Sequence, residues 1–267
     1  MRKIAIIAAM EREVAPLIRS WKMRTMEHGG RRYRLFENGE TALVCGGIGG
    51  EAARRATEAM IREVNPARVI SAGFAGALDA SLQVGDIFEP RTVINTADGA
   101  RTEVASGQGI LVTSAEVVGK EEKIRLSRAY AASAADMEAA AVAQGAGARG
   151  VEFAALKAIS DAADFSLPAL HRFVADDGVF RTVKFACHVG LRPWLWGTTI
   201  ALARNSTRAS QALCGALASY LDRESQGCQA LPGESLVSGR NQREVGPLFA
   251  GAHTRSGTQS HTPEGKQ

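Results

Sequence analysis

The 267-residue sequence lacks any apolar run close to the roughly 20 residues that span a bilayer, so we expect no integral membrane span. Its start does imitate a signal peptide, because Arg2 and Lys3 precede a short apolar segment. Charged residues at 11–13 end that segment, and no small-residue cleavage site follows. We therefore predict that residues 3–9 form a buried first strand.

Cysteine is scarce, and its spacing excludes two kinds of site. No cysteine stands in the CxxC or CxxH arrangement that is typical of a zinc site. The four residues are Cys45, Cys187, Cys214 and Cys228. Such scattered cysteines imply no disulfide framework either, so a reduced, cytoplasmic protein is the default expectation.

Charge of either sign is hardly in excess, and aromatic residues are few. The chain carries 32 Lys and Arg against 28 Asp and Glu, a formal net charge of +4, and 6% of its residues are aromatic. The dense basic patches at residues 31–34 and 54–55 lack the interleaved aromatic side chains of a platform for stacking bases. We interpret both patches as solvated faces and predict no nucleic-acid partner.

Apolar segments of strand length alternate with segments of helical periodicity from the start of the chain to about residue 160. The expected strands cover residues 3–9, 33–36, 41–45, 68–72, 87–94, 110–113 and 154–159. The expected helices cover residues 11–21, 51–64, 121–129, 137–144, 180–189, 193–204 and 206–221. This alternation predicts an α/β fold around a mainly parallel or mixed sheet.

The composition changes after Asp222, where Gly, Ser, Pro and Gln largely replace apolar residues. A segment of this kind cannot bury enough apolar surface to order itself. We therefore predict one domain over residues 1–222 and a flexible polar tail over residues 223–267.

Three polar segments interrupt the predicted structure where strands end, which is where open α/β sheets bind ligands. The first contains Glu11 and Glu13, in the first turn of a predicted helix. Both can simply complement the helix dipole. Glu13 also lies beside the apolar face formed by Val14 and Leu17, so its side chain can point back over the strand end.

The second segment is rich in glycine. Residues 45–50 and 71–78 follow expected strands, and Gly-rich turns of this kind expose backbone N–H groups to a ligand. Gly47 and Gly49 could begin a dinucleotide-binding GxGxxG pattern, but Ala52 occupies its last position, and no P-loop motif occurs. From the residues alone, a tight turn and an anion site remain alternatives.

The third segment supplies carboxylates. Glu138 begins a predicted helix that is otherwise lined with alanine, and Asp161 ends a buried strand. Carboxylates at two strand ends could exchange protons with a small polar ligand. Alternatively, Asp136 caps the helix, and Asp161 or Asp164 is a turn residue.

In their order and spacing, these segments resemble the nucleoside phosphorylase and nucleosidase superfamily. Six short motifs carry the resemblance: residues 10–13 (MERE), 47–49 (GIG), 72–76 (AGFAG), 84–86 (VGD), 136–138 (DME) and 159–161 (ISD). Within the superfamily, the sequence is most similar to the 5′-methylthioadenosine/S-adenosylhomocysteine nucleosidases. The resemblance implies a phosphorylase-like three-layer α/β/α sandwich with a central mixed sheet, and cleavage of the N-glycosidic bond of an adenosine-type nucleoside.

The resemblance also implies a role for each matching residue. Glu13 would activate the attacking water, and Asp161, supported by Ser160, would protonate purine N7 so that the base can leave. Glu138 would accept hydrogen bonds from ribose hydroxyls beside a cationic transition state. The other substrate contacts would come from Met137, Ala75 and Gly76. The implied reaction needs no metal or other cofactor.

The sequence departs from the phosphorylases of the superfamily at the turn that holds phosphate. Ser71 and Phe74 occupy positions where those enzymes have an arginine and a serine. This departure favours hydrolysis, unless Arg12, Arg31 or Arg91 supplies the missing cation.

A different likeness affects the predicted substrate. Residues 191–196 and the helices around them are similar to the hopanoid-associated phosphorylases, whose proposed substrate is adenosylhopane. Water-dependent cleavage of a small purine nucleoside, by a homodimer, is our main hypothesis. The alternatives are a phosphorylase that uses inorganic phosphate on a lipid-linked adenosine, and a nucleoside-binding protein without activity.

Overall fold

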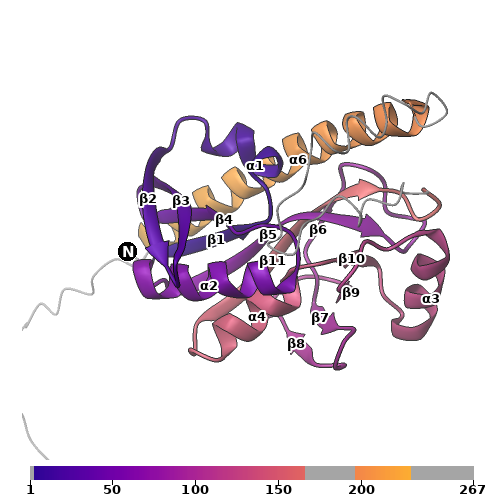
Figure 1. The fold of residues 1–267 in the computed structure, drawn as a ribbon, viewed down its shortest axis with the longest axis horizontal. Coiled ribbons are helices and arrows are strands. Elements are labelled where there is room, and N and C mark those ends of the chain that lie inside the picture. Colours follow the sequence, from indigo (N-terminus) through magenta and orange to yellow (C-terminus); the bar gives the residue numbers. More distant parts are fainter. Residues whose placement is uncertain (1–2, 166–195, 230–267) are drawn as a thin grey trace, which may run out of the picture. The chain divides into compact units, whose positions relative to one another are not determined.

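Figure 1 shows the computed structural model, which describes residues 3–165 and 196–229. In this part of the chain, an eleven-stranded sheet has helices on both faces. The strands are β1 (Ile4–Ala8), β2 (Lys22–His28), β3 (Arg31–Asn38), β4 (Thr41–Cys45), β5 (Arg68–Ala77), β6 (Ile87–Phe88), β7 (Thr92–Asn95), β8 (Arg101–Glu103), β9 (Ile110–Thr113), β10 (Ala134–Asp136) and β11 (Glu152–Asp161). The helices are α1 (Glu11–Ile18), α2 (Gly50–Val64), α3 (Lys120–Tyr130), α4 (Ala139–Gly147) and α6 (Trp196–Gln229). None of these helices combines the length and hydrophobicity needed to cross a membrane.

Strand β1 lies in the interior of the sheet, between β4 and β5. It pairs in parallel with β4 on one side and with β5 on the other, and all its residues are buried. β11 runs parallel to β5 along nearly its whole length, whereas β10 is antiparallel to β5. The sheet is therefore mixed, as predicted, and the carboxyl ends of β1, β5 and β11 meet at one edge.

Two apolar clusters hold the layers together, one on each face of the sheet. On one face, Met60 of α2 and Val142 of α4 pack with strand residues that include Ile7. On the other face, Leu213 of α6 packs with strand residues that include Ile6. Ile6 and Ile7 are neighbours in β1, and their side chains point to opposite faces of the sheet. The arrangement confirms the three-layer α/β/α sandwich (Figure 1).

The apolar pattern of the sequence misses strands at the edges of the sheet. β2 and β8 lie at opposite ends of the strand order, and both are largely exposed. Met26 is the buried residue of β2. The single strand predicted over residues 87–94 is wrong. It consists of β6 and β7, which lie on either side of Pro90, a residue with no N–H to donate to a strand pair.

The prediction of two separate helices in the C-terminal part is wrong, because α6 is a single helix. The two helices predicted over residues 193–204 and 206–221 form one continuous helix from Trp196, and Ser206 lies inside it. The face of α6 that meets the sheet carries a buried residue at every fourth position: Ala209, Leu213 and Leu217. This spacing follows the helical repeat through the predicted break, so burial of the face favours one long helix.

Helix α6 also extends beyond residue 222, where we predicted that the domain ends. α6 continues past residue 222 to Gln229, so residues 223–229 belong to the helix and not to a tail. The rest of the predicted tail, residues 230–267, lies outside the described residues, as does the helix predicted over residues 180–189.

Candidate active site

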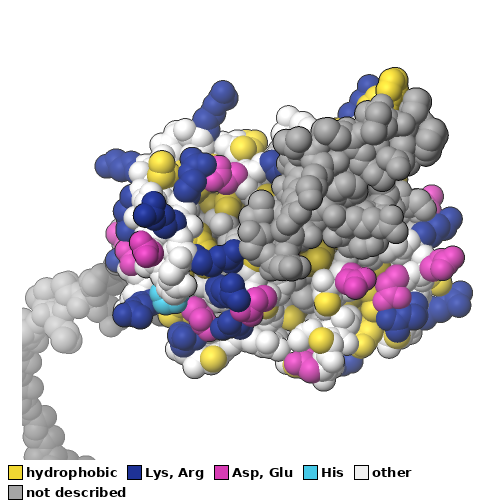
Figure 2. Space-filling model, in the orientation of Figure 1, with side chains coloured by type: hydrophobic (Ala, Val, Ile, Leu, Met, Phe, Trp, Pro, Cys, Tyr) yellow, Lys and Arg dark blue, Asp and Glu magenta, His cyan; other side chains and the backbone are white. Residues whose placement is uncertain are grey.

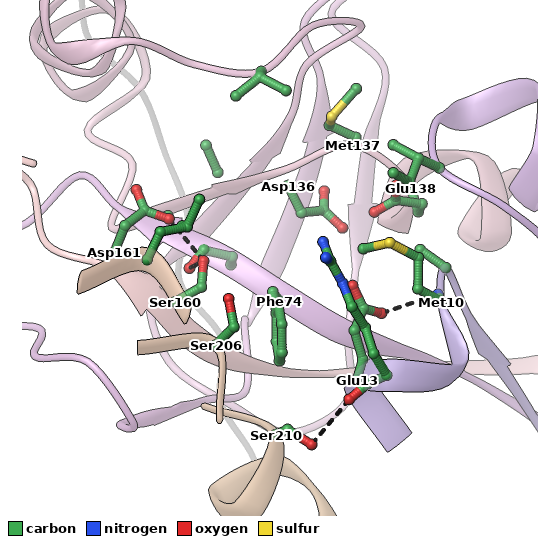
Figure 3. Close-up of a pocket in the computed structure, with 18 of the residues that line it drawn as sticks. Met10, Glu13, Phe74, Asp136, Met137, Glu138, Ser160, Asp161, Ser206 and Ser210 are labelled. Carbon is green, nitrogen blue, oxygen red and sulfur yellow. Dashed lines mark hydrogen bonds between the residues drawn. The ribbon is translucent and has the colours of Figure 1, made fainter. Parts of the chain in front are cut away.

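A cavity of about 600 Å³ opens at the edge of the sheet where β1, β5 and β11 end, and helices α1 and α6 contribute to its wall. All the residues that the sequence predicts for the site line this cavity: Glu13, Ala75, Gly76, Met137, Glu138, Ser160 and Asp161. Figure 3 shows Asp161 and Ser160 toward one side of the cavity, and Glu13 and Glu138 toward the other. Folding therefore brings together carboxylates that lie far apart in the sequence.

Glu13 reaches the cavity from the first turn of α1, directly after β1. Its side chain is buried, and Oε2 accepts a hydrogen bond from the backbone N–H of Met10 at 3.3 Å (Figure 3). Burial raises the pKa of Glu13 to about 7, and the Met10 hydrogen bond and the positive charge of Lys157 only partly oppose this effect. Glu13 can therefore exchange a proton near neutral pH, which is the property that a general base needs.

Glu138 stands directly before α4, and its carboxylate binds the glycine-rich segment. Oε1 accepts a hydrogen bond from the backbone N–H of Gly49 at 2.8 Å. Burial, reinforced by the negative charge of Asp136, raises the pKa of Glu138 to about 7. Because a protein side chain already binds the Gly49 N–H, the structure favours a tight turn over an anion site at residues 45–50.

A buried ion pair lies close to the two glutamates. Nζ of Lys157, in β11, lies 2.8 Å from Oδ2 of Asp136 and donates a hydrogen bond to Oγ of Ser71 at 3.0 Å. Asp136 also accepts a hydrogen bond from the backbone N–H of Ala139 at 2.9 Å, which agrees with the predicted helix cap. Although burial opposes its charge, the negative charges of Asp136 and Glu138 raise the pKa of Lys157. Lys157 is therefore a stable cation among buried carboxylates.

An irregularity in β11 places Asp161. The register of β11 against β5 shifts between Ile159, which pairs with Ala75, and Asp161, which pairs with Gly76. A bulge of this kind changes the direction of the side chains around it. Ser160, the residue inside the bulge, donates a hydrogen bond from Oγ to Oδ1 of Asp161 at 2.7 Å, and both side chains line the cavity (Figure 3).

Asp161 has a second partner, Lys123 in α3. Nζ of Lys123 forms an ion pair with Oδ2 of Asp161 and donates a hydrogen bond to the backbone carbonyl of Ala162 at 2.7 Å. Only 1% of the surface of Lys123 is exposed. Each carboxylate oxygen of Asp161 therefore accepts a hydrogen bond from a neighbouring side chain.

Lys157 and Lys123 are two buried cations next to the site carboxylates that the sequence does not predict. Lys157 does leave a signal, because it interrupts the apolar segment 154–159 that forms a buried strand. Lys123 leaves none, since its helix contains many charged residues and a lysine there is typical of a solvated face. Only its contact with Asp161, across 38 positions of the chain, distinguishes it.

A known protein family matches most of the chain. The sequence model of the Phosphorylase superfamily matches residues 3–107 and 96–184, which together make up more than half of the chain. The chain belongs to this superfamily. The matched residues include every residue predicted for the site.

Curated relatives of this phosphorylase-superfamily member are 5′-methylthioadenosine/S-adenosylhomocysteine nucleosidases. The one from Hydrogenovibrio crunogenus is 30% identical over 200 residues, which are 60% of this chain and 86% of that protein. The one from Psychromonas ingrahamii is 40% identical over 90 residues, which are 32% of this chain and 38% of that protein.

Solved structures show the same fold. A mutant of the Helicobacter pylori nucleosidase with 5′-methylthioadenosine in its active site has a TM-score of 0.64 and 19% identity, over 84% of this chain and 99% of that chain. The futalosine hydrolase of Helicobacter pylori has a TM-score of 0.63 and 19% identity, over 83% of this chain and 98% of that chain. These likenesses confirm the phosphorylase-like α/β fold.

At positions 71 and 74, this superfamily member lacks the arginine and the serine that we expect of a phosphate-binding turn. Ser71 is buried and accepts a hydrogen bond from the lysine of β11, and Phe74 forms an apolar part of the cavity wall (Figure 3). Of the three arginines considered above, Arg12 lines this cavity, while Arg31 lines a second cavity and Arg91 binds a backbone carbonyl. Among the described residues, no cluster of His, Cys, Asp or Glu side chains is arranged to hold a metal ion.

Replacing Lys157 by methionine should strongly destabilise the fold. The change keeps most of the side-chain volume but leaves Asp136 buried without its cation. Removing one partner of a buried ion pair typically costs about 3–5 kcal/mol. The free energy of unfolding, measured by chemical denaturation, should fall by that amount, whereas Lys120→Met, at an exposed position, should leave it nearly unchanged. A loss smaller than about 1 kcal/mol would show that the ion pair is not important for stability.

Proposed function

We propose that this member of the Phosphorylase superfamily uses water to cleave the N-glycosidic bond of an adenosine-type nucleoside. The observation that carries the proposal is the placement of the carboxylates around one cavity: Glu13 and Glu138 toward one side and Asp161 toward the other. Such a cavity can place acidic groups at both ends of a sugar–base bond. The nucleosidases among its relatives support this class of substrate.

The chemistry of glycosidic cleavage matches these positions. As the bond breaks, the sugar gains positive charge and the base gains negative charge. Glu138 supplies negative charge and hydrogen-bond acceptors for the ribose, with Met137 as an apolar contact beside it. Glu13 takes a proton from the attacking water, and Asp161 delivers a proton to the leaving purine.

Carboxylates outnumber cations around the cavity, which favours water over phosphate as the nucleophile. The negatively charged residues that line it are Glu13, Glu116, Asp136, Glu138 and Asp161, and the positively charged ones are Arg12 and Lys123. Glu13 is buried and Glu138 is half-buried, and Asp136 lies next to Glu138 with Lys157 as its cation. A phosphate anion would be repelled by these carboxylates in a site of low dielectric. Phe74 adds an apolar wall in place of a hydrogen-bond donor. Neutral water is not repelled.

Release of adenine from 5′-methylthioadenosine, measured with and without inorganic phosphate, tests the proposal. We expect release in phosphate-free buffer at a rate that added phosphate does not change, with free methylthioribose as the other product. Strict dependence on phosphate and formation of a sugar phosphate would instead show a phosphorylase. Tight nucleoside binding without any release of base would show a binding protein.

The wall of the cavity supports a second candidate substrate, an adenosine with a long apolar 5′ group. Helices α1 and α6 contribute apolar residues to the cavity beyond the carboxylates: Ala15, Pro16, Leu202 and Ala203. A lipid-linked adenosine could place its apolar group against these residues. In the same assay, kcat/KM should then increase along a series of 5′-alkylthioadenosines of growing length, and equal or falling values would exclude this candidate.

Replacing Gly76 by alanine should lower kcat. A Cβ at this position would lie 2.9 Å from Oδ2 of Asp161. Because Lys123 and Ser160 both hold that carboxylate, it can move only by weakening one of these hydrogen bonds. Misplacement of a reacting group by about 1 Å can cost up to 10²-fold, so we expect kcat to fall by about 10-fold to 100-fold.

The matched control for Gly76→Ala is Gly147→Ala. A Cβ at Gly147 would meet nothing within 4 Å, so this variant should keep full activity. Both variants should retain the unfolding temperature of the wild type to within a few degrees. Full activity in Gly76→Ala would show that the position of Asp161 does not depend on this glycine.

A further inference from the structure

The Lys123–Asp161 ion pair raises a question that the proposed mechanism does not answer. The proposed mechanism requires Asp161 to carry a proton at the moment when the purine leaves, and it names no source for that proton. The group in this pair that already carries protons is the Lys123 ammonium, and its Nζ is hydrogen-bonded to the same carboxylate.

Two further contacts fix the geometry of the pair. The carbonyl of Ala162 accepts a hydrogen bond from Nζ of Lys123 at 2.7 Å, so the ammonium is held from two sides. Ser160 holds the other oxygen of Asp161 at 2.7 Å. Lys123 is almost completely buried and yet lines the cavity. The pair is thus rigid, shielded from bulk water and open to whatever occupies the cavity.

We propose that Lys123 positions Asp161 and is the source of the proton that Asp161 passes to the leaving purine. This inference rests on the proposed function. It makes Lys123 a positioning residue and proton donor that acts through Asp161. Of these two residues, only Asp161 contacts the base.

The proton steps balance within one turnover. An N–H bond of Lys123 breaks as an O–H bond forms on Asp161, and that O–H bond breaks as an N–H bond forms on purine N7. The electron pair of the glycosidic bond goes to the base, which leaves neutral. Water gives hydroxide to the sugar carbon and its proton to Glu13. To close the turnover, the amine of Lys123 regains a proton from solvent through the cavity, and Glu13 releases to solvent the proton that it took from water.

Two substitutions separate the supply of a proton from the supply of a charge. Lys123→Arg keeps a cation with several N–H donors, but a guanidinium does not release a proton under these conditions. Lys123→Met keeps a similar volume and removes the cation, so Asp161 can take its proton from water. Lys120→Met, at an exposed position of the same helix, is the matched control.

The experiment compares single-turnover rates of adenine release from 5′-methylthioadenosine in the four proteins. The wild type and Lys120→Met should be equal. Lys123→Arg should be slower by about 10²–10⁴-fold, the range for losing a general acid, and Lys123→Met by only about tenfold. The variant that keeps the charge should therefore be the slower of the two. Thermal unfolding checks that each variant is folded.

A second substrate tests whether the loss is specific to protonation of the base. The leaving group of p-nitrophenyl riboside departs as an anion and needs no proton, so both Lys123 variants should cleave it within about threefold of the wild type. Parallel losses on both substrates would show a merely structural role and overturn the inference. So would a Lys123→Arg variant that is as fast as, or faster than, Lys123→Met.

The two proposals fail in different ways. If the wild type releases no base from any nucleoside, the proposed function is wrong, and the inference falls with it. If the wild type releases base and the variants follow one of the contrary patterns above, only the role of Lys123 is wrong.

Discussion

An Asp161→Asn variant is expected to release adenine about 10²–10⁴-fold more slowly than the wild type, the usual range for losing a general acid. Asparagine has the size of aspartate, and its amide oxygen can still accept the hydrogen bond from Ser160. It has no acidic proton to give to purine N7. The loss should therefore appear in kcat with little change in the binding of adenine.

The control for this variant has to account for stability as well as activity. Asp161→Asn leaves the buried ammonium of Lys123 without its anion, so we expect a lower free energy of unfolding in addition to the loss of turnover. Turnover must be measured at a temperature where the variant is fully folded. Asp164→Asn, at an exposed position nearby, should behave as the wild type. Near wild-type adenine release by Asp161→Asn would remove this residue from the mechanism.

Glu13→Gln is expected to have a comparable effect, a loss of about 10²–10⁴-fold in turnover, because glutamine cannot take a proton from water. Its amide oxygen can still accept the Met10 hydrogen bond, so the start of α1 should keep its shape. Glu11→Gln is the matched control in the same turn. That carboxylate is 41% exposed and pairs with Arg34 at the surface, so its loss should leave turnover unchanged. Equal activity of the two variants would contradict the role of Glu13.

The pH dependence of the wild type should reflect both glutamates. Burial raises the pKa of Glu13 and that of Glu138 to about 7, and each must be ionised to act as proposed. We therefore expect kcat/KM to fall as the pH falls below about 7. Because Glu13 and Glu138 interact, the apparent pKa of this acidic limb belongs to the pair and not to either residue alone. A profile that stays flat down to pH 5 would contradict these assignments.

The raised pKa of Glu13 also predicts an effect on stability, with a definite sign. A carboxyl whose pKa is about 7 in the fold and 4.5 in the unfolded chain stabilises the fold at low pH. That contribution is lost as the pH rises through 7, where the buried group must ionise. Glu13→Gln should therefore be more stable than the wild type at pH 8, by at most about 3 kcal/mol, and similar to it at pH 4. Chemical denaturation at the two pH values measures the difference.

Much of the sheet follows from the sequence because its central strands are largely apolar. β1, β9 and β11 lie close to the ranges predicted for them, since a strand buried on both faces reads as a mainly apolar run, even where a lysine interrupts it as in β11. β2 is missed because an exposed edge strand needs no apolar pattern. The end of α6 is missed for a related reason. Residues 222–226 of the helix are polar and exposed, so composition alone does not distinguish them from a tail.

The candidate site divides in the same way. The sequence by itself indicates Glu13, Glu138 and Asp161, because a carboxylate at the end of an apolar strand is a local pattern, and the order of the motifs identifies the superfamily. Only the tertiary structure shows that Lys157 and Lys123 are the buried cations that accompany these carboxylates. The cost of burying a charge depends on which opposite charge the fold places beside it, and that partner lies on another element of the chain. The sequence does not show which carboxylate a given lysine pairs with, so the electrostatics of this site are decided by the fold.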